Sequence, residues 1–199
     1  MTTSDPTASP TTFDLQTQVD SVDATLSRVR TAVLALGSNL GNRLETLQGA
    51  VDELGDTPGV KVTAVSGVFE TAAVGGPEDQ PSYFNAVLLL RTTLPPRDLL
   101  ERANAVEDAF GRKRTVRWGA RTLDVDIVSY QDVLSDDPVL LLPHPRAHER
   151  AFVLAPWSDA DPDADLPGHG KVADLLAGLG GAEAQDVHRR TDIQLRLPE

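Results

Sequence analysis

The sequence predicts an α+β fold in which two helices cover one face of an antiparallel sheet. Two observations predict it. Apolar positions switch between strand spacing and helix spacing in the order β-α-β-β-α-β, and 40% hydrophobic content in 199 residues is enough for one sizeable core. The chain is too short for two independent catalytic domains. We therefore expect one main domain at residues 31–182, an N-terminal arm at 1–30 that is disordered or loosely ordered, and a C-terminal tail at 183–199.

The first half of the domain is expected to run strand, helix, strand, strand. Residues 32–36 (AVLAL) form an apolar run that ends in the turn GSNLGN. Asn42 can cap the helix predicted at 43–55, where apolar residues fall at helical spacing. Residues 60–70 alternate like one strand, and the more apolar strand at 84–91 is expected near the centre of the sheet.

The second half is expected to supply the other helix and a fourth strand. Two prolines suited to a helix start open residues 92–111, whose apolar side chains fall on one face. The strand at 122–130 (TLDVDIVSY) follows. This element order is typical of a ferredoxin-like sandwich with an antiparallel sheet. A short helix near 172–179 (VADLLAGL) predicts a C-terminal helical extension.

Composition excludes several classes of protein. The formal net charge of −12 argues against non-specific nucleic-acid binding, which needs basic residues to neutralise phosphates. The chain has no cysteine, so disulfides and thiolate metal sites are excluded. It also lacks an apolar run long enough for a membrane span and a signal-peptide pattern at the start. We expect a cytoplasmic monomer without nucleic-acid or membrane partners.

Two carboxylates occupy alternate positions of the strand at 122–130. Asp124 and Asp126 therefore point to one face of the sheet, while their apolar neighbours point to the other. Two close carboxylates repel each other unless a cation lies between them, and Mg²⁺ prefers a few carboxylate oxygens together with water and phosphates. The alternative is that both residues line the solvent side of an edge strand and pair with nearby arginines.

The segment before these carboxylates, GRKRTVRWGAR at residues 111–121, carries only basic charges. Guanidinium groups bind phosphate oxygens through two parallel hydrogen bonds. A metal and an arginine clamp together are typical of phosphoryl-type transfer, where catalysis is mostly positioning and charge neutralisation. Because the chain has no P-loop signature, any nucleotide site must be of another kind.

Two further polar features allow more than one interpretation. His144 and His148 have a spacing that could suggest zinc, but Pro145 breaks the helix such a pair would need and no third ligand follows at a recognised spacing. His144 is better suited to a phosphate or ribose, and His148 is expected to face solvent. Asn85 lies on an apolar strand, where its amide could bind a ligand or serve as a structural hydrogen-bonding group.

Four segments occur in a familiar order and spacing: ALGSNLGN, DQPSYFNAV, GRKRTVRWGARTLDVDIV and LPHPRAHERAFVL. Through them the chain resembles the 6-hydroxymethyl-7,8-dihydropterin pyrophosphokinases of folate biosynthesis over residues 31–160. The resemblance implies a ferredoxin-like α+β fold. It also implies an enzyme that transfers the β,γ-pyrophosphoryl group of ATP to the hydroxymethyl oxygen of the pterin and releases AMP.

The resemblance further implies roles for individual residues. Two Mg²⁺ ions would bridge Asp124 and Asp126 to the triphosphate of ATP, and Arg112 and Arg121 would act on the transferring group. The residues expected to border ATP are Gln80, Asn104, Glu107, Arg114, Arg117, Ile127, Leu140, His144 and Arg150. The residues in pterin-pocket positions are Thr71, Ala72, Val74, Tyr83, Asn85, Trp118 and Phe152.

Some positions depart from the commonest family pattern. Ala72 and Ala73 stand where prolines are frequent, and Ala120 replaces a common proline. These departures concern the pocket wall, whereas the metal and arginine positions are intact. A second hypothesis from another class is a non-catalytic ferredoxin-like regulatory module that binds a small anion at the arginine segment. The carboxylate pair discriminates between them, because an anion binder gains nothing from two aspartates beside its ligand.

Overall fold

The computed structural model describes residues 29–73, 80–111, 121–180 and 186–198. None of the helices in these ranges is long and apolar enough to cross a membrane. A short 3₁₀ helix spans Ala147–Glu149. The other elements, in chain order, are β1 (Arg30–Ser38), α2 (Arg43–Gly55), β2 (Val60–Val65), β3 (Val68–Thr71), β4 (Tyr83–Thr92), α3 (Pro96–Ala109), β5 (Asp124–Tyr130), β6 (Ser135–Asp137), β7 (Leu140–Leu142), α4 (Ala151–Ala160), β8 (Asp165–Leu166), β9 (Gly170–Lys171), α5 (Val172–Gly178) and β10 (Val187–Arg190).

The main sheet has the strand order β10-β3-β4-β1-β5, and β2 also pairs with β4. The pairs within it are antiparallel. The two long strands β1 and β4 lie at the centre, where each is hydrogen-bonded on both sides. The β-α-β-β-α-β core and its antiparallel sheet confirm the predicted α+β, ferredoxin-like class.

Local signals explain how the chain turns from β1 into α2. Gly41 adopts a φ of 67°, a conformation that glycine reaches without a steric penalty. Asn42 then caps α2, because its side-chain oxygen accepts a hydrogen bond from the Glu45 amide. The helix ends at Gly55, as its sequence predicts.

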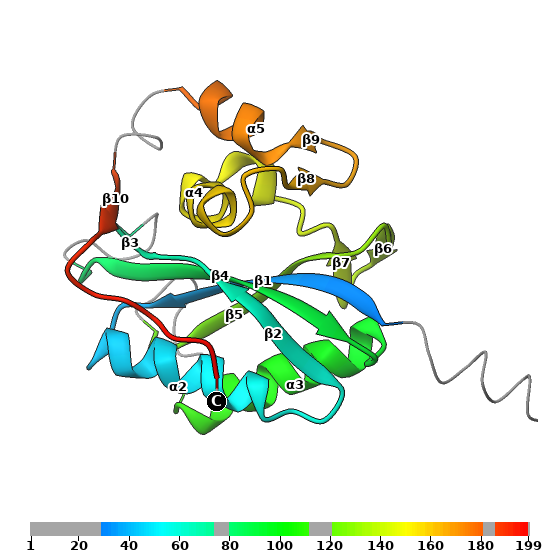
Figure 1. The fold of residues 1–199 in the computed structure, drawn as a ribbon, viewed down its shortest axis with the longest axis horizontal. Coiled ribbons are helices and arrows are strands. Elements are labelled where there is room, and N and C mark those ends of the chain that lie inside the picture. The colour runs from blue at the N-terminus through cyan, green and yellow to red at the C-terminus, as the bar shows by residue number, and fades with distance from the viewer. Residues whose placement is uncertain (1–28, 74–79, 112–120, 181–185, 199) are drawn as a thin grey trace, which may run out of the picture.

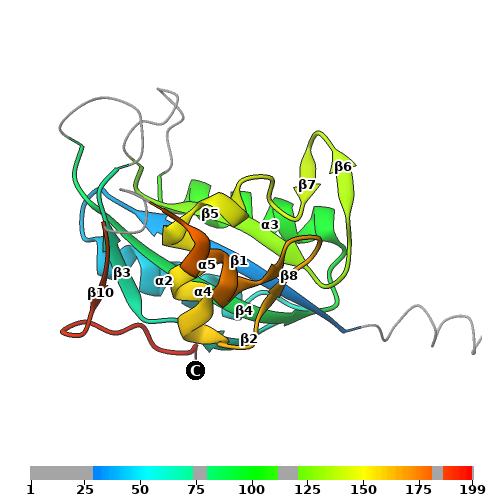
Figure 2. The ribbon, with the colours of Figure 1, turned by 90° about the horizontal axis from the view of Figure 1, so that it is seen from above.

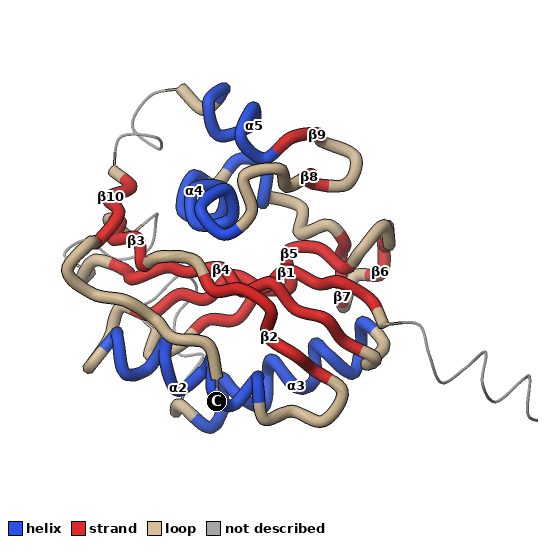
Figure 3. Tube along the Cα trace, viewed as in Figure 1, coloured by secondary structure: helices blue, strands red, loops and turns tan. Residues whose placement is uncertain are grey.

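Helices cover both faces of the sheet. Figure 1 shows α2 and α3 against one face and α4 and α5 against the other, and Figure 3 shows the sheet as a layer between them. Figure 2 shows α4 and α5 lying over the sheet. Side chains that alternate along β1 supply both cores: Leu34 packs on the α2–α3 side and Val33 on the α4–α5 side. The C-terminal extension therefore buries the second face of the sheet.

The predicted strand at 60–70 is wrong as one continuous element, because it is split into β2 and β3 at Ser66 and Gly67. The Ser66 amide still donates to the Val87 carbonyl at 3.0 Å. The Val87 amide, however, donates to the Ser66 hydroxyl at 2.9 Å. A side-chain oxygen takes the hydrogen bond that a strand carbonyl would accept, and this interrupts the ladder.

Residues 187–198, in the predicted C-terminal tail, pack against the domain. They contribute β10, which pairs with β3, and then run back toward α2 (Figure 1). Leu195 is buried in the α2–α3 core. The Arg196 amide donates to Gln48 Oε1 at 2.8 Å, and Gln48 Nε2 donates to the Arg196 carbonyl at 3.1 Å. The end of the chain is thus attached to α2 by apolar burial and by hydrogen bonds.

The central strand β1 offers a test of this packing. Leu34 is fully buried, so Leu34→Ala is expected to lower the free energy of unfolding by about 2–5 kcal/mol through lost burial and a cavity. Urea unfolding followed by circular dichroism measures this. Leu134→Ala is the matched control, because that side chain is 70% exposed and should change stability by less than about 0.5 kcal/mol. Equal losses for the two variants would contradict the packing described here.

Candidate active site

A cavity of about 540 Å³ lies at one end of the main sheet, where β1 and β3 finish and β4, β5 and β10 begin. The 3₁₀ helix and the start of α4 form its other side. Because the first turn of a helix presents amide groups and a partial positive charge, this side favours an anion. The lining residues are Gly37, Thr71, Ala72, Ala73, Gln80, Tyr83, Arg121, Asp124, Asp126, Arg146, Glu149, Arg150, Ala151, Phe152, Asp186 and Val187.

Gly37 keeps the floor of the cavity open. In the sheet it pairs with Asn85 of β4 on one side and with Asp124 of β5 on the other. A Cβ atom at this position would lie 3.3 Å from Asn85 Oδ1 and 3.6 Å from Tyr83 Cδ1. Any larger residue would therefore crowd the polar side chains that surround the cavity.

The two aspartates of β5 face the cavity and are partly exposed. Their neighbours Leu123 and Val125 are buried in the α2–α3 core, as the alternation along the strand predicts. The strand end is held from the core side by the buried carboxylate of Glu107, which accepts a hydrogen bond from the Val125 amide at 2.7 Å. This bond holds the β5 backbone between Asp124 and Asp126 and so helps to position both side chains in the cavity.

Arg121 is held next to the carboxylates by its backbone and by its side chain. Its amide donates to Asn39 Oδ1 at 2.7 Å, and the Asn39 amide donates to the Arg121 carbonyl at 3.1 Å. Its guanidinium donates to Asp124 Oδ1 at 2.7 Å. Burial lowers the pKa of Arg121, but the charge and hydrogen bond of Asp124 outweigh it and raise the pKa overall. Arg121 therefore remains a fixed positive charge in the cavity.

Two aromatic rings border the cavity on different elements. Tyr83 begins β4, and burial raises the pKa of its phenol, with Arg121 opposing this shift and Asp124 adding to it. The phenol therefore stays protonated near neutral pH. Phe152 lies in the first turn of α4, and the Arg150 guanidinium carbon is 5.4 Å from the centre of its ring. The cavity thus combines flat apolar surfaces with charged groups.

A histidine and an arginine approach the second carboxylate. His144 Nε2 and Arg150 Nη1 each lie 4.0 Å from Asp126 Oδ2. Burial, together with the charge of Arg150, lowers the pKa of His144 from 6.5 to about 4. His144 is therefore neutral at pH 7, and its approach to Asp126 is not an ion pair. Burial also lowers the pKa of Arg150, while Asp126 opposes that shift.

The structure brings many of the predicted site residues together. Asn85 lies next to the cavity and donates to Thr71 Oγ1 at 2.8 Å, so its amide has a structural partner whether or not it also binds a ligand. His144 adjoins the cavity through Asp126. The predicted residues that line the cavity are Thr71, Ala72, Gln80, Tyr83, Arg121, Asp124, Asp126, Arg150 and Phe152.

Other predicted residues are placed elsewhere. Asn104, Glu107, Ile127 and Leu140 do not line this cavity, and the last three are buried. Their expected position beside ATP stays a prediction. Residues 112–120, which include Arg112, Arg114, Arg117 and Trp118, lie outside the described part of the chain, as does Val74.

The cavity also contains residues that sequence reasoning missed. Arg146 and Glu149 belong to the motif LPHPRAHERAFVL, so their neighbours His144 and Arg150 could have drawn attention to them. Gly37 belongs to the motif ALGSNLGN, but no local signal marks it as the floor or Val187 as a wall. Both positions follow from the pairing of distant strands, which a local pattern does not reveal.

Known proteins resemble this chain over most of its length. The family model described as 7,8-dihydro-6-hydroxymethylpterin-pyrophosphokinase matches residues 33–162. The chain belongs to this family. A 2-amino-4-hydroxy-6-hydroxymethyldihydropteridine pyrophosphokinase of Mycobacterium leprae is 45% identical over 179 residues, which cover 83% of this chain and 91% of the relative. The pyrophosphokinase of the same name from Pseudomonas aeruginosa is 42% identical over 149 residues, which cover 75% of this chain and 91% of the relative.

Solved structures related to this pyrophosphokinase family support the fold. A variant of the Plasmodium falciparum HPPK-DHPS protein, crystallised with pterin and p-hydroxybenzoate, matches with a TM-score of 0.62 at 13% identity. The match covers 84% of this chain but only 49% of that one, so the chain spans about half the length of the larger protein. At this identity the likeness concerns the fold alone.

The low pKa of His144 predicts a pH dependence of stability. An unfolded chain takes up a proton near pH 6.5, whereas folded His144 does so only near pH 4. The contribution of His144 to the free energy of unfolding is therefore fully present above pH 6.5, and it is lost as the pH falls toward 4. We expect the free energy of unfolding of His144→Gln to fall less between pH 6.5 and pH 4 than that of the wild type. Urea unfolding at several pH values, without added metal or ligand, measures this. His188→Gln, at an exposed position, should leave the wild-type slope unchanged. Parallel slopes for all three proteins would contradict the assignment.

Proposed function

We propose that the cavity at the end of the sheet is the active site of a pterin pyrophosphokinase, a transferase of folate biosynthesis. The family's reaction is ATP-dependent transfer of pyrophosphate to the hydroxymethyl group of 6-hydroxymethyl-7,8-dihydropterin. The hydroxymethyl oxygen bonds to the β-phosphorus, the bond from this phosphorus to the α-phosphate oxygen breaks, and AMP leaves. The observation that carries the assignment is the pair Asp124 and Asp126, which face a cavity that also contains Arg121 and Arg150.

The carboxylate pair has the chemistry expected of a Mg²⁺ site. Hard cations take oxygen ligands, and Mg²⁺ is commonly held by one or two carboxylates with substrate phosphates and water. Within the described ranges no group of three or more acidic, histidine or cysteine side chains that could hold a metal ion is found. Asp124 and Asp126 would hold two Mg²⁺ ions, which supply charge neutralisation when bound.

Cationic groups around the pair suit a polyphosphate. Arg121 is fixed by Asn39 and Asp124, and Arg150, at the start of α4, approaches Asp126. Preorganised charges of this kind stabilise the negative charge that moves onto the leaving phosphate. Arg112, Arg114 and Arg117 are proposed to add to this clamp. Gln80 and His144 are proposed to border ATP, together with Asn104, Glu107, Ile127 and Leu140 near the β5 edge.

Other groups that line the cavity suit the pterin ring. Tyr83 and Phe152 offer aromatic faces for a flat heterocycle, and Trp118 is proposed to add a third. Asn85 can present amide hydrogen-bonding groups to the pterin edge while Thr71 fixes its orientation. Ala72 and Val74 are proposed to complete this wall. We propose that these small molecules are the partners of a monomeric enzyme that binds no nucleic acid.

A direct assay separates this function from a non-catalytic anion-binding module. Purified protein is incubated with ATP, Mg²⁺ and 6-hydroxymethyl-7,8-dihydropterin, and the nucleotide products are separated by chromatography. AMP formation that depends on the pterin supports the proposal. ADP as the product, or binding of ATP without turnover, would contradict it.

The metal role of β5 predicts that Asp126→Ala lowers kcat by roughly 100-fold or more while the fold is kept, because a metal ligand is lost. AMP release at saturating substrates measures kcat, and circular dichroism checks the fold. Asp136→Ala is the matched control, since this aspartate is exposed on β6, away from the cavity. Near-normal turnover by Asp126→Ala at ordinary Mg²⁺ concentrations would refute the metal assignment.

The proposed transition-state role of Arg121 predicts a separate effect. Arg121→Lys keeps the charge but loses the planar fork, so kcat should fall by about 10-fold or more while KM for ATP changes less. Steady-state kinetics with ATP as the varied substrate resolves the two constants. Arg91→Lys, on an exposed position of β4, should leave both unchanged. A rise in KM with kcat preserved would reassign Arg121 to ground-state binding.

A further inference from the structure

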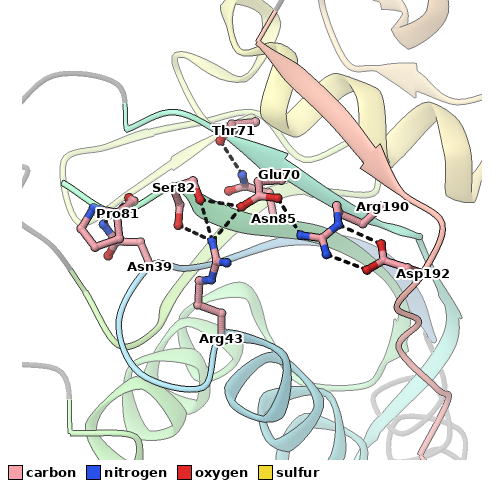
Figure 4. Close-up of polar contacts among 9 residues, drawn as sticks. All are labelled: Asn39, Arg43, Glu70, Thr71, Pro81, Ser82, Asn85, Arg190 and Asp192. Atoms are coloured by element: carbon pink, nitrogen blue, oxygen red, sulfur yellow. Dashed lines mark hydrogen bonds and ion pairs between the residues drawn. The ribbon is translucent and has the colours of Figure 1, made fainter. Parts of the chain in front are cut away.

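A network of charged residues is centred on Glu70 of β3, on the face of the sheet away from the cavity. Thr71, the next residue, lines the cavity, so the alternation of the strand points Glu70 toward α2. Glu70 Oε1 accepts hydrogen bonds from the Ser82 hydroxyl at 2.6 Å and from Arg43 Nη1 at 3.1 Å. Glu70 Oε2 accepts one from Arg190 Nη1 at 2.6 Å. Figure 4 shows the three partners converging on this one carboxylate.

The partners of Glu70 belong to three different segments, two of which contribute residues to the cavity wall. Ser82 lies between the lining residues Gln80 and Tyr83, and Arg43 also donates to the Ser82 carbonyl at 2.7 Å. Arg190 ends β10, the strand whose first residue, Val187, lines the cavity. One carboxylate thus connects the segment before β4 and the C-terminal strand.

The third segment is the turn between β1 and α2. Arg43 is the first residue of α2, directly after this turn. Within the turn, Asn39 Nδ2 donates to the Pro81 carbonyl at 3.2 Å (Figure 4). Asn39 Oδ1 accepts from the Arg121 amide at 2.7 Å. The network therefore reaches the cavity from behind on several sides, although none of its charged groups lines it.

Electrostatics makes the central carboxylate hard to replace. The guanidinium carbons of Arg43 and Arg190 lie 3.6 and 5.3 Å from the centre of the Phe84 ring, so two positive charges share one small region. Asp192 neutralises part of this charge through Arg190. The Ser82 hydrogen bond and the two arginines hold the pKa of Glu70 below its usual value, against the opposing effect of burial. A neutral side chain here would leave the arginines without their shared partner.

We propose that Glu70 is a positioning residue for pterin binding, which holds the Ser82 segment and β10 against β3 so that Tyr83, Thr71 and Val187 keep the pterin side of the cavity in shape. The inference rests on the pterin site proposed above. The carboxylates of β5 are linked to this network through Asn39 and Arg121, but they are also held by Glu107 and by the sheet, which do not depend on Glu70. Loss of Glu70 should therefore weaken pterin binding and leave the chemical step largely intact.

The test compares Glu70→Gln with Glu53→Gln. Glu53 is a matched control because it also accepts from an arginine, Arg102, at 3.0 Å, but on the outer surface of α2. Glu70→Gln should raise KM for the pterin by about tenfold, the scale of losing one charged hydrogen bond, with kcat reduced less than about twofold. Glu53→Gln should leave both constants unchanged. Calorimetric titration of pterin into enzyme saturated with a non-hydrolysable ATP analogue should show the same loss of affinity.

Two milder variants test whether Glu70 affects pterin binding through its hydrogen-bond partners. Ser82→Ala and Arg190→Gln each remove one partner of Glu70 and should each raise KM for the pterin. Glu70 and Ser82 act through the same contact. The rise in KM for the pterin in the double variant Glu70→Gln/Ser82→Ala should therefore be smaller than the product of the two single rises. These variants also decide the matter if Glu70→Gln fails to fold, because the Ser82 change removes a single hydroxyl.

The outcomes separate this inference from the proposed function. If wild type forms AMP and Asp126→Ala does not, the active site stands. The positioning role alone would then be overturned if KM for the pterin is the same in Glu70→Gln as in Glu53→Gln. The same holds if KM is unchanged in Ser82→Ala and Arg190→Gln. A fall in kcat with an unchanged KM for the pterin would also overturn it, because that pattern belongs to the chemical step.

Discussion

The two-sided character of β5 is the constraint on which the site depends. Val125 must face the α2–α3 core, so Asp124 and Asp126 must face the cavity. A shift of one residue would exchange these faces and place two carboxylates in an apolar core, at a large cost in free energy. The hydrogen bond from the Val125 amide to the Glu107 carboxylate also stabilises this register. The packing that stabilises the domain therefore also sets the position of the two carboxylates in the cavity.

Periodicity predicted the core elements because apolar residues recur at helical spacing in α2 and α3. The central strands β1 and β4 are covered on both faces and are instead nearly continuous apolar runs. Among the features that the sequence did not predict, two have local physical reasons. The break at Ser66 comes from one hydroxyl that replaces a carbonyl as acceptor, and such a substitution leaves the alternation unchanged. Helix α4 is apolar on most sides and contains Pro156, so it shows neither the polar face nor the composition of a typical surface helix.

The site was predictable where its residues are neighbours in sequence and not where distant strands meet. Arg121, Asp124 and Asp126 fall within six residues of one motif, and their charges indicate phosphate chemistry without any structure. Val187 enters the cavity because β10 pairs with β3, which places it opposite Thr71. Nothing in the composition of the C-terminal segment predicts that pairing. Gly37 likewise gains its role from Asn85 and Asp124 on both sides of β1.

The cavity has two sets of lining groups whose anchors meet at Asn39. Its charged groups lie on β5 and at the start of α4, and they are anchored by the sheet, by Glu107 and by the turn that contains Asn39. Its flatter groups lie on β3, β4, β10 and the first turn of α4, and the three strands are anchored from the opposite face of the sheet by Glu70. Asn39 binds both the Pro81 carbonyl beside Ser82 and the Arg121 amide, so changes at Asn39 should affect both sets of groups. Glu70 reaches Arg121 through Ser82 and Asn39 in turn, so a change at Glu70 should act first on the flatter groups.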